Sequence, residues 1–404
     1  MYDTYSEGTY ENFPEAQHED VVISMCRSLA ATWNLRALST LSSYEWPREK
    51  FREGPAETTT GKLLCYKSAH LEGTSVTFLE NNYKNSALFA SAHANVNDMF
   101  APGWVCCWNT KNHEFPERQW RVPIAPTALS FSTIQVNMLS VGLSNGAILM
   151  LNVSNSKIVA GSTTRLVSKH RAPVKFLSWL DNDKPELQVI SLSEDGTTNL
   201  WTLRSTGVEC ELVMTLKCVK MLPLASCQPP AARFSSQYTF PSMGITFERD
   251  PSDDTQYWLG TGDGCIYHCS LLHMDKPLKM MANHIGPVTA LAWSIKDGYT
   301  LISGGWDGKL LAHTFYNGCH KVQSIGNIEG QIIDLEWSPH NPMEFICLKA
   351  NKLQLWNIST DILKPRIEVS LSEKYNCMTF HGLTKGLLLG DTNGNIQVMM
   401  CNVV

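Results

Sequence analysis

Three side chains of types that bind metal ions lie close together in the segment DGCIYHCS, at Cys265, His268 and Cys269. Cysteine and histidine are common zinc ligands, with sulfurs about 2.3 Å from the metal. On a β-strand, however, Cys265 and Cys269 would lie about 13 Å apart at about 3.3 Å per residue, and His268 would point to the other face. If this segment is a strand, its residues cannot share one metal ion.

The segment GWVCCWN raises the same question, because Cys106 and Cys107 are adjacent. Neighbouring residues of a strand point to opposite faces, so the two thiols could neither share a metal nor bond to each other. The chain has thirteen cysteines at irregular spacing. An odd number of cysteines in a long chain favours reduced thiols that pack as small apolar residues over a disulfide framework.

Two further patterns could indicate catalysis or cofactor binding. Residues 260–264 read GTGDG, but a phosphate-binding loop leads into a helix, and here another strand is expected. A nucleophilic serine needs a histidine that a carboxylate orients, and His170, Ser191 and Asp195 are the one such set that can be traced. They also fit a structural role, described below. We therefore predict no enzyme activity and no catalytic, cofactor-binding or metal-binding residue.

The elements that carry these residues form a repeat. A turn containing Asn or Asp before Gly is followed by an alternating strand, and copies recur every 43 to 68 residues, a spacing typical of four-stranded propeller blades. We expect two-residue hairpins with positive φ at both turn positions. The copies are NGAILMLNV at Asn145, DGTTNLWTL at Asp195, DGCIYHCSL at Asp263, DGKLLAHTF at Asp307, ANKLQLWNI at Ala350 and NGNIQVMMC at Asn393.

Each turn has a matching first strand upstream, which alternates and carries an aromatic near its end. These strands are TALSFS at Thr127, VKFLSWL at Val174, GITFERD at Gly244, VTALAWS at Val288, IIDLEWS at Ile332 and NCMTFHG at Asn376. A weaker seventh copy comprises SVTFLEN at Ser75, ALFASAH at Ala87 and GWVCCWN at Gly103. The sequence predicts an all-β, seven-bladed propeller over residues 61–404.

The last copy ends in its third strand, which would leave an open edge. We expect the strand at residues 61–67, GKLLCYK, to pair there and close the ring.

Residues 1–60 would form an N-terminal extension with a helix at about residues 21–45, where apolar residues recur at roughly helical spacing. Residues 217–243, rich in Pro, Ser and Gln, predict a long loop inserted in blade four, either for docking or as a tolerated excursion.

Composition is that of a soluble globular protein, with 43% hydrophobic residues, 18% charged residues and a formal net charge of -5. No basic run suits a row of phosphates, so we expect no nucleic-acid binding. No apolar stretch is long enough for a membrane span, and the acidic, polar N-terminus is unlike a secretory signal. We expect a protein of the cytoplasm that does not bind a membrane.

The repeat resembles the WD-repeat family. In blade three, His170, Ser191, Asp195 and Trp201 occupy the positions of the family's His, Ser, Asp and Trp. This resemblance implies that the four side chains are joined by hydrogen bonds inside the blade, in a structural role. Blade five has the corresponding residues His284, Ser303 and Asp307, but it has His313 where the Trp would be. Whether that network forms is left open.

Particular stretches resemble the dynein intermediate chains, most closely the axonemal type of motile cilia and flagella. They are GWVCCWNTKN and FPER within Gly103 to Arg118, YWLGTGDGCIYHCS from Tyr257, HIGPVTALAW from His284, LLLGDTNGNIQV from Leu387 and GKLL from Gly61. The resemblance covers about residues 60 to 404. It implies a non-catalytic scaffold in the cytoskeleton of the cilium or flagellum, at the axoneme, that supports microtubule-based movement.

The resemblance also implies partners. They are a dynein heavy chain and a second dynein intermediate chain; light chains, which family members bind through a longer N-terminal arm, are a further candidate although the region before the propeller is shorter here. The alternatives are an intermediate chain of cytoplasmic or intraflagellar-transport dynein, or a WD-repeat substrate adaptor of a ubiquitin ligase.

Overall fold

The computed structural model divides the chain into two units, Met1–Phe51 and Arg52–Val404. It describes residues 62–400, apart from residues 96, 156, 162–168, 181–185, 205–206, 222–236, 274–275, 295–298, 317–318, 327–329, 340 and 382–385. The helix expected at about residues 21–45 lies outside the described residues. The account below concerns the second unit.

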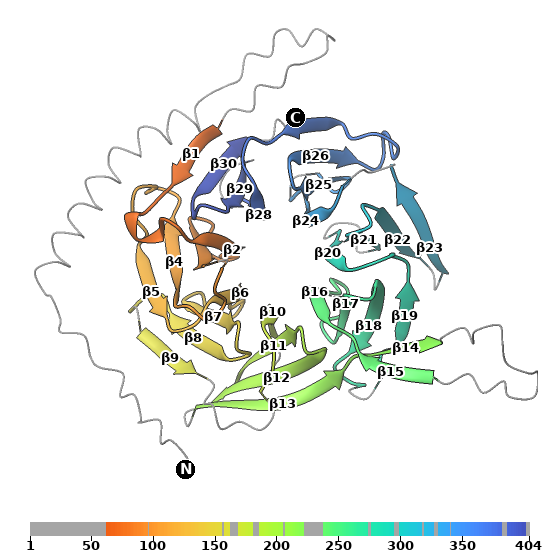
Figure 1. Ribbon diagram of the computed structural model, residues 1–404, viewed down its shortest axis with the longest axis horizontal. Coiled ribbons are helices and arrows are strands. Elements are labelled where there is room, and N and C mark those ends of the chain that lie inside the picture. The colour runs from red at the N-terminus through yellow and green to blue at the C-terminus, as the bar shows by residue number, and fades with distance from the viewer. Residues whose placement is uncertain are drawn as a thin grey trace, which may run out of the picture. The chain divides into compact units, whose positions relative to one another are not determined.

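Seven four-stranded antiparallel sheets stand around a common centre, as Figure 1 shows, so the predicted all-β, seven-bladed propeller is confirmed. Blades one to three consist of β2 (Ser75–Asn81), β3 (Leu88–Ala94), β4 (Gly103–Asn109) and β5 (Arg118–Val122); β6 (Pro126–Phe131), β7 (Met138–Leu143), β8 (Ile148–Asn152) and β9 (Lys157–Gly161); and β10 (Val174–Leu180), β11 (Leu187–Ser193), β12 (Thr197–Arg204) and β13 (Gly207–Thr215).

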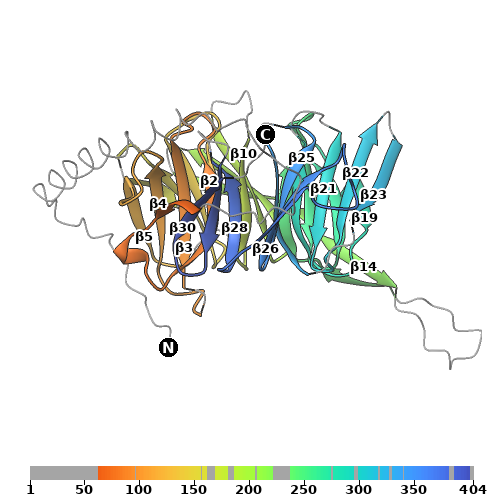
Figure 2. The same cartoon turned by 90° about the horizontal axis from the view of Figure 1, so that it is seen from above.

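Blades four to six follow the same order, from the innermost strand to the outermost. They consist of β16 (Gly244–Arg249), β17 (Gln256–Thr261), β18 (Cys265–Ser270) and β19 (Lys279–Ala282); β20 (Val288–Trp293), β21 (Thr300–Gly305), β22 (Leu310–Tyr316) and β23 (Cys319–Ile325); and β24 (Ile332–Trp337), β25 (Glu344–Lys349), β26 (Lys352–Asn357) and β27 (Ile367–Ser370). Figure 2 shows the ring edge-on, with the strands running between its two faces.

Blade seven joins the two ends of this unit. Its inner strands are β28 (Tyr375–Phe380), β29 (Gly386–Asp391) and β30 (Ile396–Met400), and its outermost strand is β1 (Lys62–Tyr66). β1 pairs antiparallel with β30, with Tyr66 opposite Ile396 and Lys62 opposite Met399. A strand from before the first blade therefore covers the edge that the last strand would otherwise expose. One short 3-10 helix, η1 (Ala69–Leu71), connects β1 to blade one.

The turns between the second and third strands differ from the prediction. In blade two, the Gly146 N–H donates to the Leu143 carbonyl at 3.1 Å and the Leu143 N–H donates to the Ala147 carbonyl at 2.9 Å. Residues 144–146 thus form a three-residue turn, typical of a type I turn followed by a glycine bulge, and the predicted two-residue turn was wrong. The left-handed conformation falls on Gly146, with φ +81°, and recurs at Gly196, Gly264, Gly308 and Gly394.

Residues 217–243 also differ from the prediction of a loop. Their ends form β14 (Lys217–Met221) and β15 (Gln237–Pro241), which pair antiparallel as a hairpin between blades three and four. Figure 1 shows this hairpin at the rim of the ring. The segments KCVKM and QYTFP contain β-branched and aromatic residues that favour strands, a signal masked by the Pro and Ser between them. Residues 222–236 lie outside the described residues.

The apolar core lies between blades, where the face of one sheet packs on the next. One cluster joins blades one and two, another joins blades three and four, and five others join the remaining pairs of neighbouring blades. Glycines let adjacent blades approach. A Cβ added to Gly390 would lie 2.6 Å from Val76 Cγ1, where blade seven meets blade one. Within the described part of the chain, no helix has the length and apolar character needed to cross a bilayer.

Replacing Gly390 by Ala tests this close approach. The added methyl would collide with the β-branched Val76 and with Cys377 Sγ at 2.7 Å. We expect the free energy of unfolding to fall by about 1–3 kcal/mol, as for other overpacked cores, measured by urea denaturation. The matched control is Gly161→Ala, whose Cβ would meet only the flexible end of Leu149 at 3.0 Å. Equal stability of the two variants would contradict the close-packing role of Gly390.

Candidate functional site

The adjacent cysteines of blade one lie on opposite faces of β4. Cys107 packs in the cluster between blades one and two, whereas Cys106 packs with Trp108 and Tyr66 in the cluster toward blade seven. Cys106 is 1% exposed and Cys107 0%. Burial raises the pKa of both thiols well above the usual cysteine value, so they stay protonated at neutral pH and are poor nucleophiles.

The three possible zinc ligands of blade four are also separated by their strand. Cys265 and Cys269 point into the cluster between blades three and four. His268 lies on the opposite face of β18 and stacks on Trp258, with ring centroids 4.1 Å apart. Among the residues that the structure describes, no group of three His, Cys, Asp or Glu side chains could hold a metal ion.

The GTGDG segment joins two strands, because Thr261 ends β17 and Cys265 begins β18. Thr261 Oγ1 donates to the Cys265 carbonyl at 2.9 Å and closes the turn. The strand β18 stands where a phosphate-binding loop would have a helix, so this turn lacks the helix N-terminus that binds phosphate.

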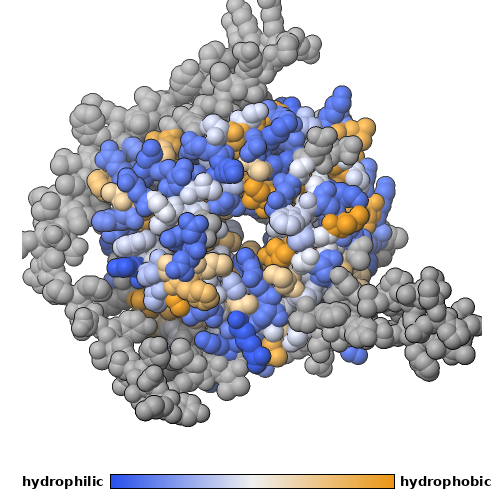
Figure 3. All heavy atoms as spheres, viewed as in Figure 1, coloured by the Kyte–Doolittle hydropathy of each residue, from blue (hydrophilic) through white to orange (hydrophobic). Residues whose placement is uncertain are grey.

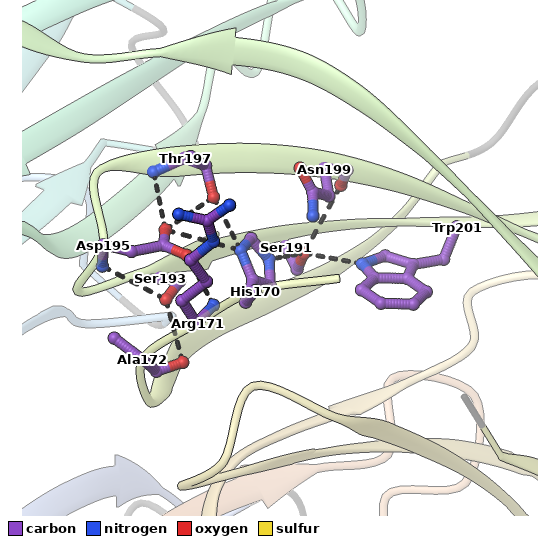
Figure 4. A network of polar contacts seen from close by, with 9 residues as sticks. All are labelled: His170, Arg171, Ala172, Ser191, Ser193, Asp195, Thr197, Asn199 and Trp201. Atoms are coloured by element: carbon purple, nitrogen blue, oxygen red, sulfur yellow. Dashed lines mark hydrogen bonds and ion pairs between the residues drawn. The ribbon is translucent and has the colours of Figure 1, made fainter. Parts of the chain in front are cut away.

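The blade-three residues form a buried network centred on Ser191, shown in Figure 4. His170 Nε2 lies 2.6 Å from Ser191 Oγ, and Trp201 Nε1 donates to the same oxygen at 2.7 Å. His170 Nδ1 lies 2.8 Å from Thr197 Oγ1, which donates to Asp195 Oδ1 at 2.5 Å. Since Ser191 is 1% exposed, no substrate can reach its hydroxyl, and the network joins the loop before β10 to β11 and β12.

Electrostatics support the same structural role. Burial by itself would raise the pKa of Asp195, but hydrogen bonds from His170, Thr197 and the Arg171 backbone N–H together hold this pKa well below its usual value. The carboxylate is therefore ionised at neutral pH, as an acceptor at the end of the network should be.

The blade-five network, which the sequence left open, forms with a histidine in place of the tryptophan. His284 Nε2 and His313 Nε2 each lie 2.9 Å from Ser303 Oγ, and His284 Nδ1 lies 3.1 Å from Asp307 Oδ1. Blade one has a similar network, which the sequence did not indicate because its histidine does not precede the first strand as it does in blades three and five. There Ser91 Oγ accepts from Trp108 Nε1 at 2.8 Å and lies 2.8 Å from Nε2 of His93, which is on the same strand.

Hydrogen bonds connect the innermost strands of neighbouring blades around the centre of the ring. Glu248 Oε1 of blade four accepts the Trp293 N–H of blade five at 3.4 Å, and Glu336 Oε2 of blade six accepts the Phe380 N–H of blade seven at 3.0 Å. In the other direction, Arg249 Nη1 donates to the Trp179 carbonyl of blade three at 2.8 Å. These bonds cross blade boundaries, where backbone pairing within each sheet cannot reach.

The channel carboxylates influence one another from different blades. Burial, and then the charge of Glu248, raises the pKa of Glu80 to about 8. Burial, and then the charge of Asp334, raises the pKa of Glu248 to about 8. Burial raises the pKa of Asp334 to about 6 and that of Glu336 well above its usual value. Burial and mutual repulsion therefore make ionisation of these carboxyl groups less favourable than it is in water.

Large apolar side chains gather on one face at blades four and five. We call this the turn face, since it carries the turns at residues 144–146, 194–196, 262–264, 306–308 and 392–394. Met243 is 49% exposed, Ile285 80% and Trp306 58%; together they are the apolar patch. The Trp306 N–H donates to the Pro287 carbonyl at 2.9 Å, so Trp306 lies beside the loop that carries Ile285.

Further contacts fix the positions of the segments that carry these side chains. A Cβ on Gly262 would lie 3.3 Å from Met243 Cβ, and the same turn abuts the His284 carbonyl through Gly264. The Ile285 N–H donates to Asp307 Oδ2 at 2.9 Å, which ties the patch to the buried blade-five network. Figure 3 shows hydrophobic residues as separate patches among hydrophilic ones on the face seen in Figure 1. Aromatic residues and methionine are enriched at protein interfaces relative to the rest of the surface.

The raised pKa of Glu248 predicts a pH dependence of stability. A carboxyl group with a folded-state pKa above its unfolded value stabilises the fold at low pH, and that contribution is lost as pH rises from about 4.5 through about 8. Glu248→Gln keeps an oxygen for the Trp293 N–H but does not ionise. We expect it to be more stable than the parent at pH 8.5 by roughly 1–3 kcal/mol, less than the full linkage because Glu248 is partly exposed.

The measurement is urea denaturation of both proteins from pH 5 to pH 8.5. The control is Glu114→Gln, which removes an exposed carboxyl group on a loop and should leave the pH dependence unchanged. Parallel curves for the parent and Glu248→Gln would show that ionisation of Glu248 does not oppose folding.

Known proteins resemble the chain in both sequence and structure, although no family model matches it. "Dynein axonemal intermediate chain 4" of Xenopus laevis is 27% identical over 376 residues, covering 89% of this chain and 50% of that protein. Its human counterpart is 28% identical and covers 83% of this chain and 41% of that protein. The 78 kDa intermediate chain of the Chlamydomonas reinhardtii flagellar outer arm is 24% identical, over 73% of this chain and 43% of that protein.

A solved structure shows the same fold. The Cps50 (Swd1) β-propeller domain of Myceliophthora thermophila aligns with a TM-score of 0.61 and 13% identity, covering 81% of this chain and 97% of that domain. This chain spans about half or less of the length of the dynein relatives named above. The ubiquitin-ligase adaptor and the other dynein classes are not favoured by these relatives. The resemblance seen in the sequence is confirmed: over most of its length, the chain is similar to dynein intermediate chains of the axonemal type.

Proposed function

We propose that this protein is a non-catalytic intermediate-chain subunit of an axonemal dynein. In this role it binds a dynein heavy chain, alongside a second intermediate chain, and supports the movement of cilia or flagella. The observation that carries the proposal is the similarity to axonemal dynein intermediate chains, which in the Xenopus relative extends over 89% of this chain. The proposed location is the axoneme.

The propeller suits a scaffold for a physical reason. Buried networks hold the strands within blades together, and hydrogen bonds connect neighbouring blades, as between Glu336 and the Phe380 N–H. A ring braced in this way presents its faces with little loss of conformational freedom when a partner binds. Force from a motor can then pass through the subunit without deforming the surface that holds the partner.

We further infer that the apolar patch contributes to the heavy-chain contact. Trp306 is an exposed tryptophan, a residue type enriched among those that dominate binding energy. Ile285 lies beside it, and its loop is held by the bond from its N–H to Asp307. A preformed apolar patch of this kind fits the apolar side of an amphipathic helix better than it fits an extended, charged peptide.

Purification of the tagged full chain from cells with motile cilia or flagella tests the function. We expect a dynein heavy chain and another intermediate chain among the proteins recovered, identified by mass spectrometry. Cullin-type ligase subunits in place of heavy chain would favour the adaptor alternative. Recovery of neither would contradict the proposed function.

A double substitution, Ile285→Ser with Trp306→Ala, tests the role of the apolar patch. Because both side chains are exposed, the fold should persist, while heavy-chain recovery should fall by roughly tenfold or more. The matched control is Tyr316→Ala, which removes an exposed aromatic at the end of β22 on the opposite face. Equal recovery with a folded double variant would place the contact elsewhere on the protein.

A further inference from the structure

The blade-five network does not end at His313, as the blade-three network ends at Trp201. His313 Nδ1 lies 3.3 Å from His320 Nε2 on the outermost strand of the blade. His320 Nδ1 in turn lies 3.2 Å from Nζ of Lys279, which is on β19 of blade four. The hydrogen bonds therefore run from Asp307 on the turn face, through the interior of blade five, to an exposed ammonium of the neighbouring blade.

The partners at the two ends fix the direction of every bond between them. An ammonium only donates, so His320 Nδ1 must accept from Lys279 and the ring proton must lie on Nε2. His320 then donates to His313 Nδ1, which places the proton of His313 on Nε2, facing Ser303. A carboxylate only accepts, so His284 carries its proton on Nδ1 and donates to Asp307. Ser303 donates to His284 Nε2 and accepts from His313.

Comparison with blade three shows why the extension matters. Trp201 Nε1 is a donor only, so Ser191 receives its hydrogen bond whatever surrounds the indole. A neutral histidine has two tautomers, and only one of them can donate to Ser303. His313 must carry its proton on Nε2 to donate to Ser303, and the bond from His320 favours this tautomer. The tautomer of His320 in turn depends on Lys279, a side chain of another blade.

We propose that His320 and Lys279 set the tautomer of His313 and thereby form an acid-sensitive latch between the outer strands of blades four and five. Stacking holds the latch in place, because the His320 ring lies parallel to Phe315, with centroids 4.7 Å apart, and to His313, with centroids 5.6 Å apart. Protonation of His320 would leave both its nitrogens as donors, with Nδ1–H facing the Lys279 ammonium. The bond between the blades would then break.

The charged surroundings give the direction of the pH effect. Burial, and then Lys279, lowers the pKa of His320. Burial, followed by His320, His284 and Lys279, lowers the pKa of His313 to about 3. Asp307 faces His284, as does Lys309, while His268 on β18 faces Lys279 and also senses Asp250 and Asp253.

Each latch histidine therefore has a folded-state pKa below its unfolded value of 6.5. Their contribution to stability is present above pH 6.5 and is lost as the pH falls below it.

Hydrogen exchange of the full chain, read by mass spectrometry, tests the latch. At pH 7.5, Lys279→Met should speed exchange in β19 and β23 by roughly fivefold to tenfold, the ratio that the loss of one hydrogen bond gives. Adding His313→Trp should bring the rate in β23 back near the parental value, since a tryptophan needs no help from His320. Parental exchange should also rise in these strands at pH 5.5, after correction for the intrinsic rate.

The control is Lys321→Met, which removes an exposed lysine that follows His320 on β23. The latch is wrong if Lys279→Met exchanges like the parent, or if His313→Trp gives no recovery in the Lys279→Met background. Nitrogen-15 NMR of histidine-labelled parental protein tests the proton order directly and needs no variant. His313 and His320 should both carry the proton on Nε2 at pH 7.5, and a proton on Nδ1 of either ring would overturn the proposal.

Discussion

The pairing of β1 with β30 is the constraint on which the rest of the structure depends. Each blade buries its faces only against two neighbours, so an open ring would leave blades one and seven each with an exposed apolar face. β1 comes from before blade one and completes blade seven, with Tyr66 opposite Ile396. Tyr66 also packs on Trp108 of blade one, with ring centroids 5.6 Å apart. One strand thus links the first blade to the last.

Within the closed ring, the position of a Cys, Ser or His side chain on its strand decides whether it is buried in the core or available for chemistry. Cys106, Cys107, Cys265 and Cys269 are buried, and their strands separate them. Ser191 and Ser303 sit at the centres of hydrogen-bond networks that no substrate can enter. Residues that could do chemistry elsewhere pack between blades or hydrogen-bond within them here, which leaves the exposed turns and loops as the surfaces available for partners.

Local pattern was enough to predict the seven blades, because alternation and turn residues repeat along the chain, whereas the blade-three network was expected from the resemblance to the WD-repeat family. The prediction failed for residues 217–243, where Pro and Ser in the middle hid the strand-forming ends, and for the turns, whose residues suit more than one turn type. Asn145-Gly146 is compatible with two turn types, and only the bond from Gly146 to Leu143 distinguishes them. The latch could not be predicted, because Lys279 and His320 are 41 residues apart and meet only when two blades pack. The same holds for the apolar patch, which three separate segments build.

The central proposal is that the turn face of this propeller binds a dynein heavy chain. Lysine cross-linking of intact axonemes, followed by mass spectrometry, tests it most directly, because the exposed Lys309 lies three residues after Trp306. Our account predicts cross-links from Lys309 to a heavy chain. Heavy-chain cross-links confined to lysines of the opposite face, such as Lys111, would contradict the assigned face, and the absence of any heavy-chain cross-link from this protein would contradict the function itself.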